Sequence, residues 1–245
     1  MKQHEAVIKT LKKLGGVATL GQLNQEVLRI KECHWGTKTP FASIRRIVQT
    51  RPEIYKIKPG LYGLAALRDQ NEAKGILEET RRNKNSQELL VSNHAYYQGL
   101  LLTIGRLKKF DTFSPQQDKN KKFLDKPLKE IRTLSDIPNF SYSEFVRRSG
   151  TIDVIWFNQR KMPHSFFEVE SSTDIQNSLA KYNDLQDFYV RMFIVADRNR
   201  KAEYEMKIVR SSFADIKGRV KFVDYESVVK QYEYAIGYNE LEVVI

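Results

Sequence analysis

Residues 151–156 read Thr-Ile-Asp-Val-Ile-Trp, and residues 166–170 read Phe-Phe-Glu-Val-Glu. Apart from their carboxylates, both stretches are rich in β-branched and aromatic residues, so each predicts a strand. Alternation along the second strand places Glu168 and Glu170 on the same face, and an antiparallel neighbour can set Asp153 beside them. A carboxylate inside an apolar strand needs a partner to be buried. The two strands therefore predict a cluster of acids that binds a cation.

The elements around these strands predict an α/β unit, α+β when the whole chain is considered, in which helices flank a mixed sheet. Apolar side chains at helical spacing predict a helix from residue 88 to 107, and three later helices follow the same pattern. Residues 114–150 are polar and Lys-rich and predict an irregular excursion with one or two short helices. The remaining predicted elements are strands at 110–113, 193–196 and 220–224 and helices at 175–189, 201–212 and 225–232.

The N-terminal part predicts three helices followed by a β-hairpin, the arrangement of a winged helix. The first helix spans residues 3–14, and the second begins after its N-cap, Thr19. The third spans residues 41–49, and its Phe41 is expected to face inward. A Pro-Gly pair between two alternating segments predicts the hairpin. We therefore predict a winged-helix domain at 1–67, a polar linker or linker helix at 68–87 and a second domain at 88–245.

The positive charge is concentrated in the N-terminal domain. The chain has 41 Lys+Arg, 30 Asp+Glu and a net charge of +11. Residues 1–67 contain 12 of the basic residues and four of the acidic ones, and so carry +8 of this charge. Because Lys and Arg neutralise phosphates, this asymmetry predicts that the segment binds nucleic acid.

The composition bears on the cellular compartment in which the protein is expected. The single cysteine, Cys33, excludes an intrachain disulfide and a thiolate zinc cluster. No apolar run is long enough to span a bilayer, and the N-terminus lacks the apolar stretch of a secretory signal. We expect a cytoplasmic protein without a membrane partner.

Two resemblances follow from these residues. The order of elements, with Asp153 on one strand and Glu168-Val169-Glu170 on the next, resembles the PD-(D/E)xK nuclease core, closest to the restriction-endonuclease-like group with a Glu-x-Glu third motif. Residues 37–47, Thr-Lys-Thr-Pro-Phe-Ala-Ser-Ile-Arg-Arg-Ile, and 58–64, Lys-Pro-Gly-Leu-Tyr-Gly-Leu, resemble the HARE-type winged-helix family. The chain as a whole resembles a bacterial group that joins the two.

The nuclease resemblance implies a Mg²⁺ site, at which Mn²⁺ can substitute. Asp153 and Glu168 are the expected primary ligands, with the carbonyl of Val169 as a further one. Glu170 stands where a lysine is usual, and it would be a second-metal ligand or a base that positions the attacking water. The missing positive charge would come from Lys181, eleven residues further on, or from a second metal. Gln98, one helical turn after His94, resembles an auxiliary polar position of these folds.

The winged-helix resemblance implies contacts with the major groove or with phosphates of duplex DNA. The alternative for each charged side chain is a solvated surface position. The predicted DNA-binding residues are Thr37, Lys38, Thr39, Ser43, Arg45 and Arg46 near the third helix, and Lys56 and Lys58 on the wing.

Together these features predict a Mg²⁺-dependent endonuclease that cuts duplex DNA in restriction or phage defence, in the manner of a type II or a modification-dependent restriction enzyme. The winged helix would select the site, by sequence or by a modified base. One alternative is a DNA-binding regulator in which a degenerate nuclease fold serves for dimerisation, and another is a nuclease for RNA or single strands. Cutting both strands usually requires a homodimer or two sequential nicks.

Overall fold

The computed structural model describes residues 1–242, with side chains up to Gly237. The chain forms two compact units. The N-terminal unit comprises Met1–Leu89 together with the C-terminal helix from Val229 onward, and the central unit comprises Leu90–Val228. The sequence placed the second domain at 88–245, whereas the structure groups the end of the last helix with the N-terminal unit. No helix among the described residues is long and apolar enough to cross a membrane.

The N-terminal unit contains a three-stranded antiparallel sheet with the strand order β1-β3-β2. The predicted helices and hairpin are confirmed, whereas β1 was not predicted because it is only three residues long. Its elements are α1 (Gln3–Lys13), β1 (Val17–Thr19), α2 (Leu20–Leu28), α3 (Pro40–Thr50), β2 (Ile54–Lys58), β3 (Leu61–Leu64), a 3-10 turn η1 (Ala65–Leu67) and α4 (Arg68–Ala73).

Local sequence explains where these elements begin and end. Gly15 and Gly16 have φ of 82° and 90°, a region that favours glycine, and they end α1. The hydroxyl of Thr19 accepts from the N–H of Gln22 in a capping box that starts α2. Pro40 opens α3, where its missing N–H has no cost. The prediction for Phe41 is wrong: its side chain is 43% exposed, because the first turn of α3 precedes the packed stripe formed by Ile44 and Val48.

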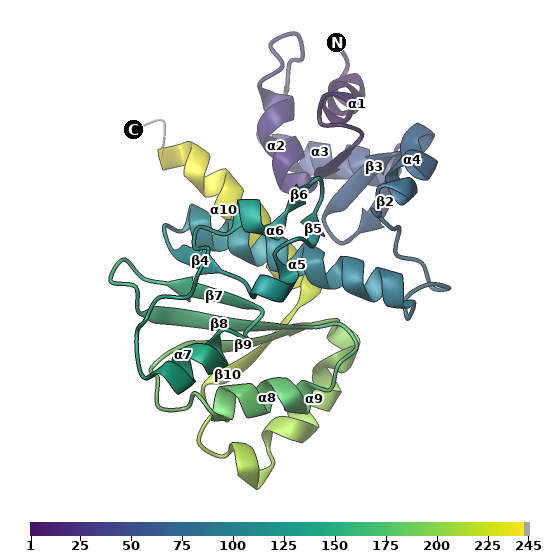
Figure 1. Ribbon diagram of the computed structural model, residues 1–245. Helices are drawn as coiled ribbons and strands as arrows, with labels where there is room; N and C mark the ends of the chain where they lie inside the picture. The colour runs from purple at the N-terminus through teal and green to yellow at the C-terminus, as the bar shows by residue number, and fades with distance from the viewer. Residues whose placement is uncertain (243–245) are drawn as a thin grey trace. The chain divides into compact units, whose positions relative to one another are not determined.

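The central unit is built on a five-stranded sheet with the order β10-β9-β8-β7-β4, and this confirms the α+β class (Figure 1). The pairs β4–β7 and β7–β8 are antiparallel, whereas the pairs β8–β9 and β9–β10 are parallel. The strands are β4 (Asp111–Phe113), β7 (Val154–Phe157), β8 (Pro163–Glu170), β9 (Arg191–Ala196) and β10 (Val220–Asp224).

Helices cover both faces of this sheet. Helix α5 lies on one face, and α8 and α9 lie on the other, over a core that includes Phe166, Leu179 and Ile194 (Figure 1). The helices and turns are α5 (Gln87–Leu107), η2 (Gln116–Asp118), α6 (Leu128–Ile131), α7 (Ser143–Ser149), α8 (Ile175–Asn183), η3 (Arg198–Arg200), α9 (Lys201–Ile208), η4 (Ser211–Phe213) and α10 (Tyr225–Glu242).

The segment at 114–150 is more ordered than the sequence predicted. It contains a small hairpin of β5 (Lys122–Phe123) and β6 (Lys126–Pro127) in addition to short helices. Gly99 of α5 allows this segment to approach closely, because a Cβ at Gly99 would lie 2.2 Å from Cγ of Phe123. This close approach brings Asp118, at the end of η2, near Gln98, the residue before Gly99. The amide nitrogen of Gln98 donates to the carboxylate of Asp118 at 2.8 Å.

The last helix, α10, contributes apolar side chains to the N-terminal unit. A Cβ on Gly21 of α2 would lie 2.9 Å from Cδ1 of Ile236 and 3.1 Å from Cε1 of Tyr232. A Cβ on Gly60 would lie 2.4 Å from Cγ1 of Val229. These three side chains are buried, so α10 is part of the packing of this unit.

Candidate metal centre and nucleic-acid interface

The candidate metal centre begins where β7 and β8 separate. Their antiparallel pairing reaches Val154 and Phe167, and Asp153 lies one residue before β7 rather than inside the strand as predicted. Beyond this pair, the carboxylate of Asp153 takes the place of a main-chain acceptor, because its Oδ2 accepts the N–H of Val169 at 2.7 Å. The N–H and C=O of one strand residue point to the same side, so the carbonyl of Val169 also faces the side of Asp153.

Glu168 lies on the α8 face of β8 and is only 2% exposed. Its Oε2 accepts from the hydroxyl of Ser178 at 3.0 Å and from Nζ of Lys181 at 2.8 Å. Lys181 also donates to the carbonyl of Thr151 at 3.1 Å, which is two residues from Asp153. The other oxygen, Oε1, is buried without a hydrogen-bond partner among the described residues. A buried carboxylate oxygen that protein atoms leave unsatisfied is available to a cation.

Glu170 follows two residues later on the same face, as predicted, but its carboxylate turns toward α8 and η3. It accepts from the hydroxyls of Ser178 and Thr173, and Nη1 of Arg200 lies 3.9 Å away. Its main-chain carbonyl accepts from the hydroxyl of Tyr225 at 3.2 Å, which fixes the end of β8. Glu170 is therefore held by hydroxyls and an arginine.

On the α5 side of Asp153, a histidine and a second aspartate complete a compact group. Nε2 of His94 lies 3.5 Å from Oδ1 of Asp153 and 3.9 Å from Oδ2 of Asp118. The ligand atoms of these three side chains all lie within 4.8 Å of one another. Gln98 donates to Asp118 at 2.8 Å and to the carbonyl of Asp153 at 3.2 Å, and Lys121 pairs with Asp118 at 2.6 Å.

The charges in this region perturb one another. Burial, together with the charge of Asp153, raises the pKa of Glu168 to about 8, although Lys181 acts in the opposite direction. Burial also raises the pKa of Glu170, against the effect of its hydroxyl donors. Burial opposes protonation of His94, but the carboxylates of Asp153 and Asp118 outweigh it and raise its pKa to about 10. Despite burial, Glu168 raises the pKa of Lys181. Such crowding of buried carboxylates is typical of functional sites.

Sequence reasoning named Asp153, Glu168, Glu170 and Lys181 but missed other side chains of the site, among them Asp118 and Arg200. Asp118 lies in the segment read as an irregular excursion, 35 residues before Asp153, and no local pattern connects the two. Arg200 lies in a 3-10 turn after β9, and its approach to Glu170 depends on the sheet order. A signal did exist for Lys181, because its helix follows directly after the strand that carries Glu168.

The comparisons with known proteins add one decisive finding. The family described as the type II restriction enzyme NmeDI C-terminal domain matches residues 76–240, which is more than half of the chain. The chain belongs to this family. Its members are domains of restriction enzymes by description, and the match identifies this chain as restriction-endonuclease-like, with DNA as the implied partner. No curated protein and no solved structure matches the chain.

The match to the NmeDI family begins after α4, so the predicted DNA-binding residues lie outside it. Around α3, Lys38, Thr39, Arg45 and Arg46 are exposed, whereas Thr37 and Ser43 are half-buried. Thr37 accepts the N–H of Thr39 through its hydroxyl at 3.1 Å, which shapes the turn before α3. Arg45 forms an ion pair with Glu233 of α10.

The two wing lysines differ from each other. Lys56 is exposed, in keeping with the expected phosphate contact. Lys58 is only 2% exposed, and burial lowers its pKa to about 8, against the attraction of Glu79. The expectation that Lys58 contacts the DNA backbone therefore fails, because a β-bulge between Lys56 and Lys58 turns the second side chain inward.

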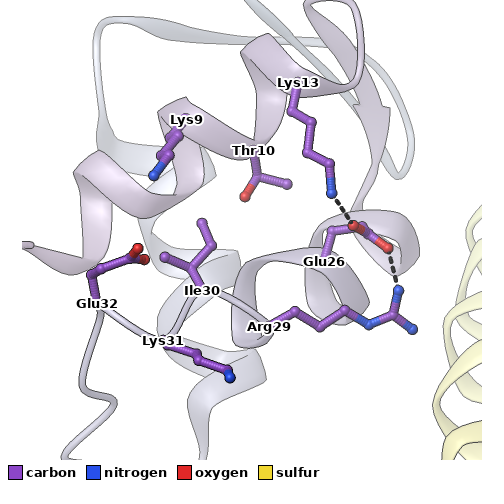
Figure 2. A pocket seen from close by; sticks show the side chains of 8 residues that line it. All are labelled: Lys9, Thr10, Lys13, Glu26, Arg29, Ile30, Lys31 and Glu32. Carbon is purple, nitrogen blue, oxygen red and sulfur yellow. Dashed lines mark hydrogen bonds and ion pairs between the residues drawn. The ribbon is translucent and has the colours of Figure 1, made fainter.

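A basic hollow of about 410 Å³ in the N-terminal unit was not predicted (Figure 2). It lies between α1 and the end of α2. Glu26 pairs with Lys13 at 2.9 Å and with Arg29 at 2.6 Å, as the dashed lines in Figure 2 show. Lys9 and Lys31 also line the hollow, so it concentrates part of the charge of this unit outside α3 and the wing.

Proposed function

We propose that this protein is a divalent-metal-dependent endonuclease that hydrolyses phosphodiester bonds of duplex DNA as a restriction or defence enzyme in the cytoplasm, with a winged helix that selects the site. The observation that carries the proposal is the junction of β7 and β8. There, buried carboxylates meet in a chain of the NmeDI restriction-enzyme family, and one oxygen of Glu168 has no hydrogen-bond partner within the described part of the chain. The resemblance of these two strands to the PD-(D/E)xK core supports the same proposal.

The residues present fit Mg²⁺ on chemical grounds. Mg²⁺ prefers oxygen ligands and keeps several of its waters, and Mn²⁺ accepts the same donors. Asp153, the carbonyl of Val169 and the free oxygen of Glu168 would supply such ligands. When bound, the cation lowers the pKa of a water and neutralises charge on the phosphate.

The protein's own side chains would then orient the reaction. The N–H of Val169 fixes the Asp153 carboxylate through a 2.7 Å hydrogen bond. Ser178 and Lys181 of α8 hold the carboxylate of Glu168. Lys181 would serve as a relocated substitute for the usual lysine of the third motif, and its ammonium, 2.8 Å from the Glu168 carboxylate, supports this role. Glu170 would position the attacking water and accept its proton, and Arg200 would balance its charge.

Duplex DNA is the substrate that the N-terminal unit favours. Its three helices and hairpin follow the winged-helix order, and its net charge of +8 over residues 1–67 suits a polyanion. Exposed basic side chains on α3 and the wing, Arg46 and Lys56 among them, are placed on the elements that such domains use. Cutting of both strands would proceed through a homodimer or through two successive nicks.

The test uses the purified chain with three plasmids, unmodified, methylated and hydroxymethylated, in Mg²⁺ and in EDTA. We expect at least one plasmid to be cut in Mg²⁺ and none to be cut in EDTA. Cleavage restricted to a modified plasmid would assign the enzyme to the modification-dependent class. Salt-sensitive binding without cleavage of any plasmid, in either Mg²⁺ or Mn²⁺, would replace the proposal with a DNA-binding regulator.

The DNA-binding assignment makes a separate prediction. Arg46→Ala and Lys56→Ala should each weaken duplex binding across all sequences and lower the slope of log affinity against log salt by about one, because each removes one phosphate contact. Fluorescence anisotropy at several salt concentrations measures this slope. The matched control is Lys201→Ala on α9, an exposed lysine paired with Glu205, which should leave the slope unchanged. Equal slopes for all the proteins would place the DNA elsewhere.

A further inference from the structure

Asp153 lies between two groups of side chains, and the proposed function uses only one of them. Glu168 and Val169 approach it from β8, whereas His94 and Asp118 approach it from α5 and η2. We propose that His94, Asp118 and Asp153 form a second cation site, which shares Asp153 with the first. This inference rests on the proposed function, since it adds a second cation to the same centre.

The geometry of the three side chains suits one ion. Nε2 of His94 is 3.5 Å from Oδ1 of Asp153 and 3.9 Å from Oδ2 of Asp118, and no two ligand atoms are more than 4.8 Å apart. Ligands at about 2.0–2.2 Å from one metal ion are at most about 4.4 Å apart. The group would therefore need to close by only a few tenths of an ångström.

Hydrogen bonds from a neighbouring side chain, Gln98, fix the positions of the two aspartates. Gln98 is fully buried, and its amide nitrogen donates to Asp118 at 2.8 Å and to the carbonyl of Asp153 at 3.2 Å. Such bonds orient metal ligands, and their loss typically costs roughly 10–100-fold in metal affinity or activity. The amide oxygen of Gln98 is buried without a hydrogen-bond partner among the described residues. This oxygen is a further acceptor without a donor, and it belongs to a side chain that contacts both aspartates.

The donor set also indicates the metal. Imidazole nitrogen suits first-row transition ions, whereas Mg²⁺ prefers oxygen ligands alone. The site at His94 would thus take a first-row transition ion in preference to Mg²⁺, and the oxygen-only site would accept either Mg²⁺ or Mn²⁺. The second cation would add positive charge at a centre in which Glu170 replaces the usual lysine.

The test counts Mn²⁺ bound per chain by electron paramagnetic resonance, without reference to cleavage. We expect two Mn²⁺ in the unsubstituted protein and one in each of His94→Gln and Asp118→Asn. Glu168→Gln should also retain one. His164→Gln, which replaces a half-buried histidine of β8 paired with Ser165, is the matched control and should retain two. Two variants are used because Asp118 is buried, whereas the His94 side chain is 20% exposed. Thermal unfolding in EDTA checks that each variant folds.

Two results would overturn the inference. One is a single Mn²⁺ in the unsubstituted protein that both His94→Gln and Asp118→Asn retain. The other is a count of two that neither substitution reduces. Both leave the proposed function intact if Glu168→Gln lowers the count and the plasmid is cut. Failure of the proposed function looks different, because then Glu168→Gln changes no metal count and no plasmid is cut.

Discussion

The Asp153→Asn protein is expected to bind duplex DNA with nearly unchanged affinity and to cut it more than about a hundredfold more slowly, since even outer-shell substitutions at metal centres typically cost about 10–100-fold. The amide keeps the shape of the side chain, and its oxygen can still accept the N–H of Val169. It removes the negative charge that the proposed ligand role requires. Because the exposed basic residues of the N-terminal unit are untouched, binding should persist.

Paired measurements would check this prediction. Anisotropy gives the affinity for a duplex, and a single-turnover time course gives the cleavage rate. Asp184→Asn is a suitable control, because Asp184 is an exposed carboxylate of the same unit. It lies at the end of α8 and pairs with Arg148 of α7. That variant should cut normally. Normal cleavage by Asp153→Asn would remove Asp153 from the centre.

The second large effect concerns stability. The double substitution Tyr232→Ala with Ile236→Ala should destabilise the N-terminal unit by roughly 5 kcal/mol or more, since each large-to-small change in a packed site costs roughly 2–5 kcal/mol. Both side chains are buried and pack against Gly21 of α2, and the hydroxyls of Tyr232 and Thr19 lie 3.4 Å apart. A loss of this size is comparable with the whole stability of a small domain.

Urea unfolding and limited proteolysis would measure the loss. We expect cleavage sites to open within residues 1–89, together with a loss of duplex affinity. The control is Tyr234→Ala on the same helix, because Tyr234 is 69% exposed. If the double variant unfolds as the unsubstituted protein does, α10 is not part of this unit. Removal of residues 1–67 alone is a poor test of the N-terminal unit, because that truncation would expose the buried side chains of Tyr232 and Ile236.

Local patterns predicted the strands of the five-stranded sheet and the positions of Glu168 and Glu170. The alternation in residues 166–170 places Glu168 and Glu170 on one face, and the structure has them there. The capping residue Thr19 and the hairpin at β2 and β3 were readable for the same reason, since each depends on neighbours in the chain.

Other features depend on contacts that no local pattern encodes. Asp118 meets His94 because Gly99 lets the excursion pack tightly on α5, and the sequence does not show that approach. Lys58 is buried because a bulge changes the direction of its side chain. The orientation of Glu170 toward Ser178 and Thr173 depends on how α8 docks on the sheet.

The most direct test of the central claim compares the unsubstituted protein and Asp153→Asn on one cleavable plasmid, in Mg²⁺ and in EDTA, with enzyme in excess. We predict that only the unsubstituted protein in Mg²⁺ converts supercoiled plasmid to nicked and linear DNA. Cleavage that continues in EDTA, or that is equal in the two proteins, would contradict a metal-dependent nuclease centred on Asp153.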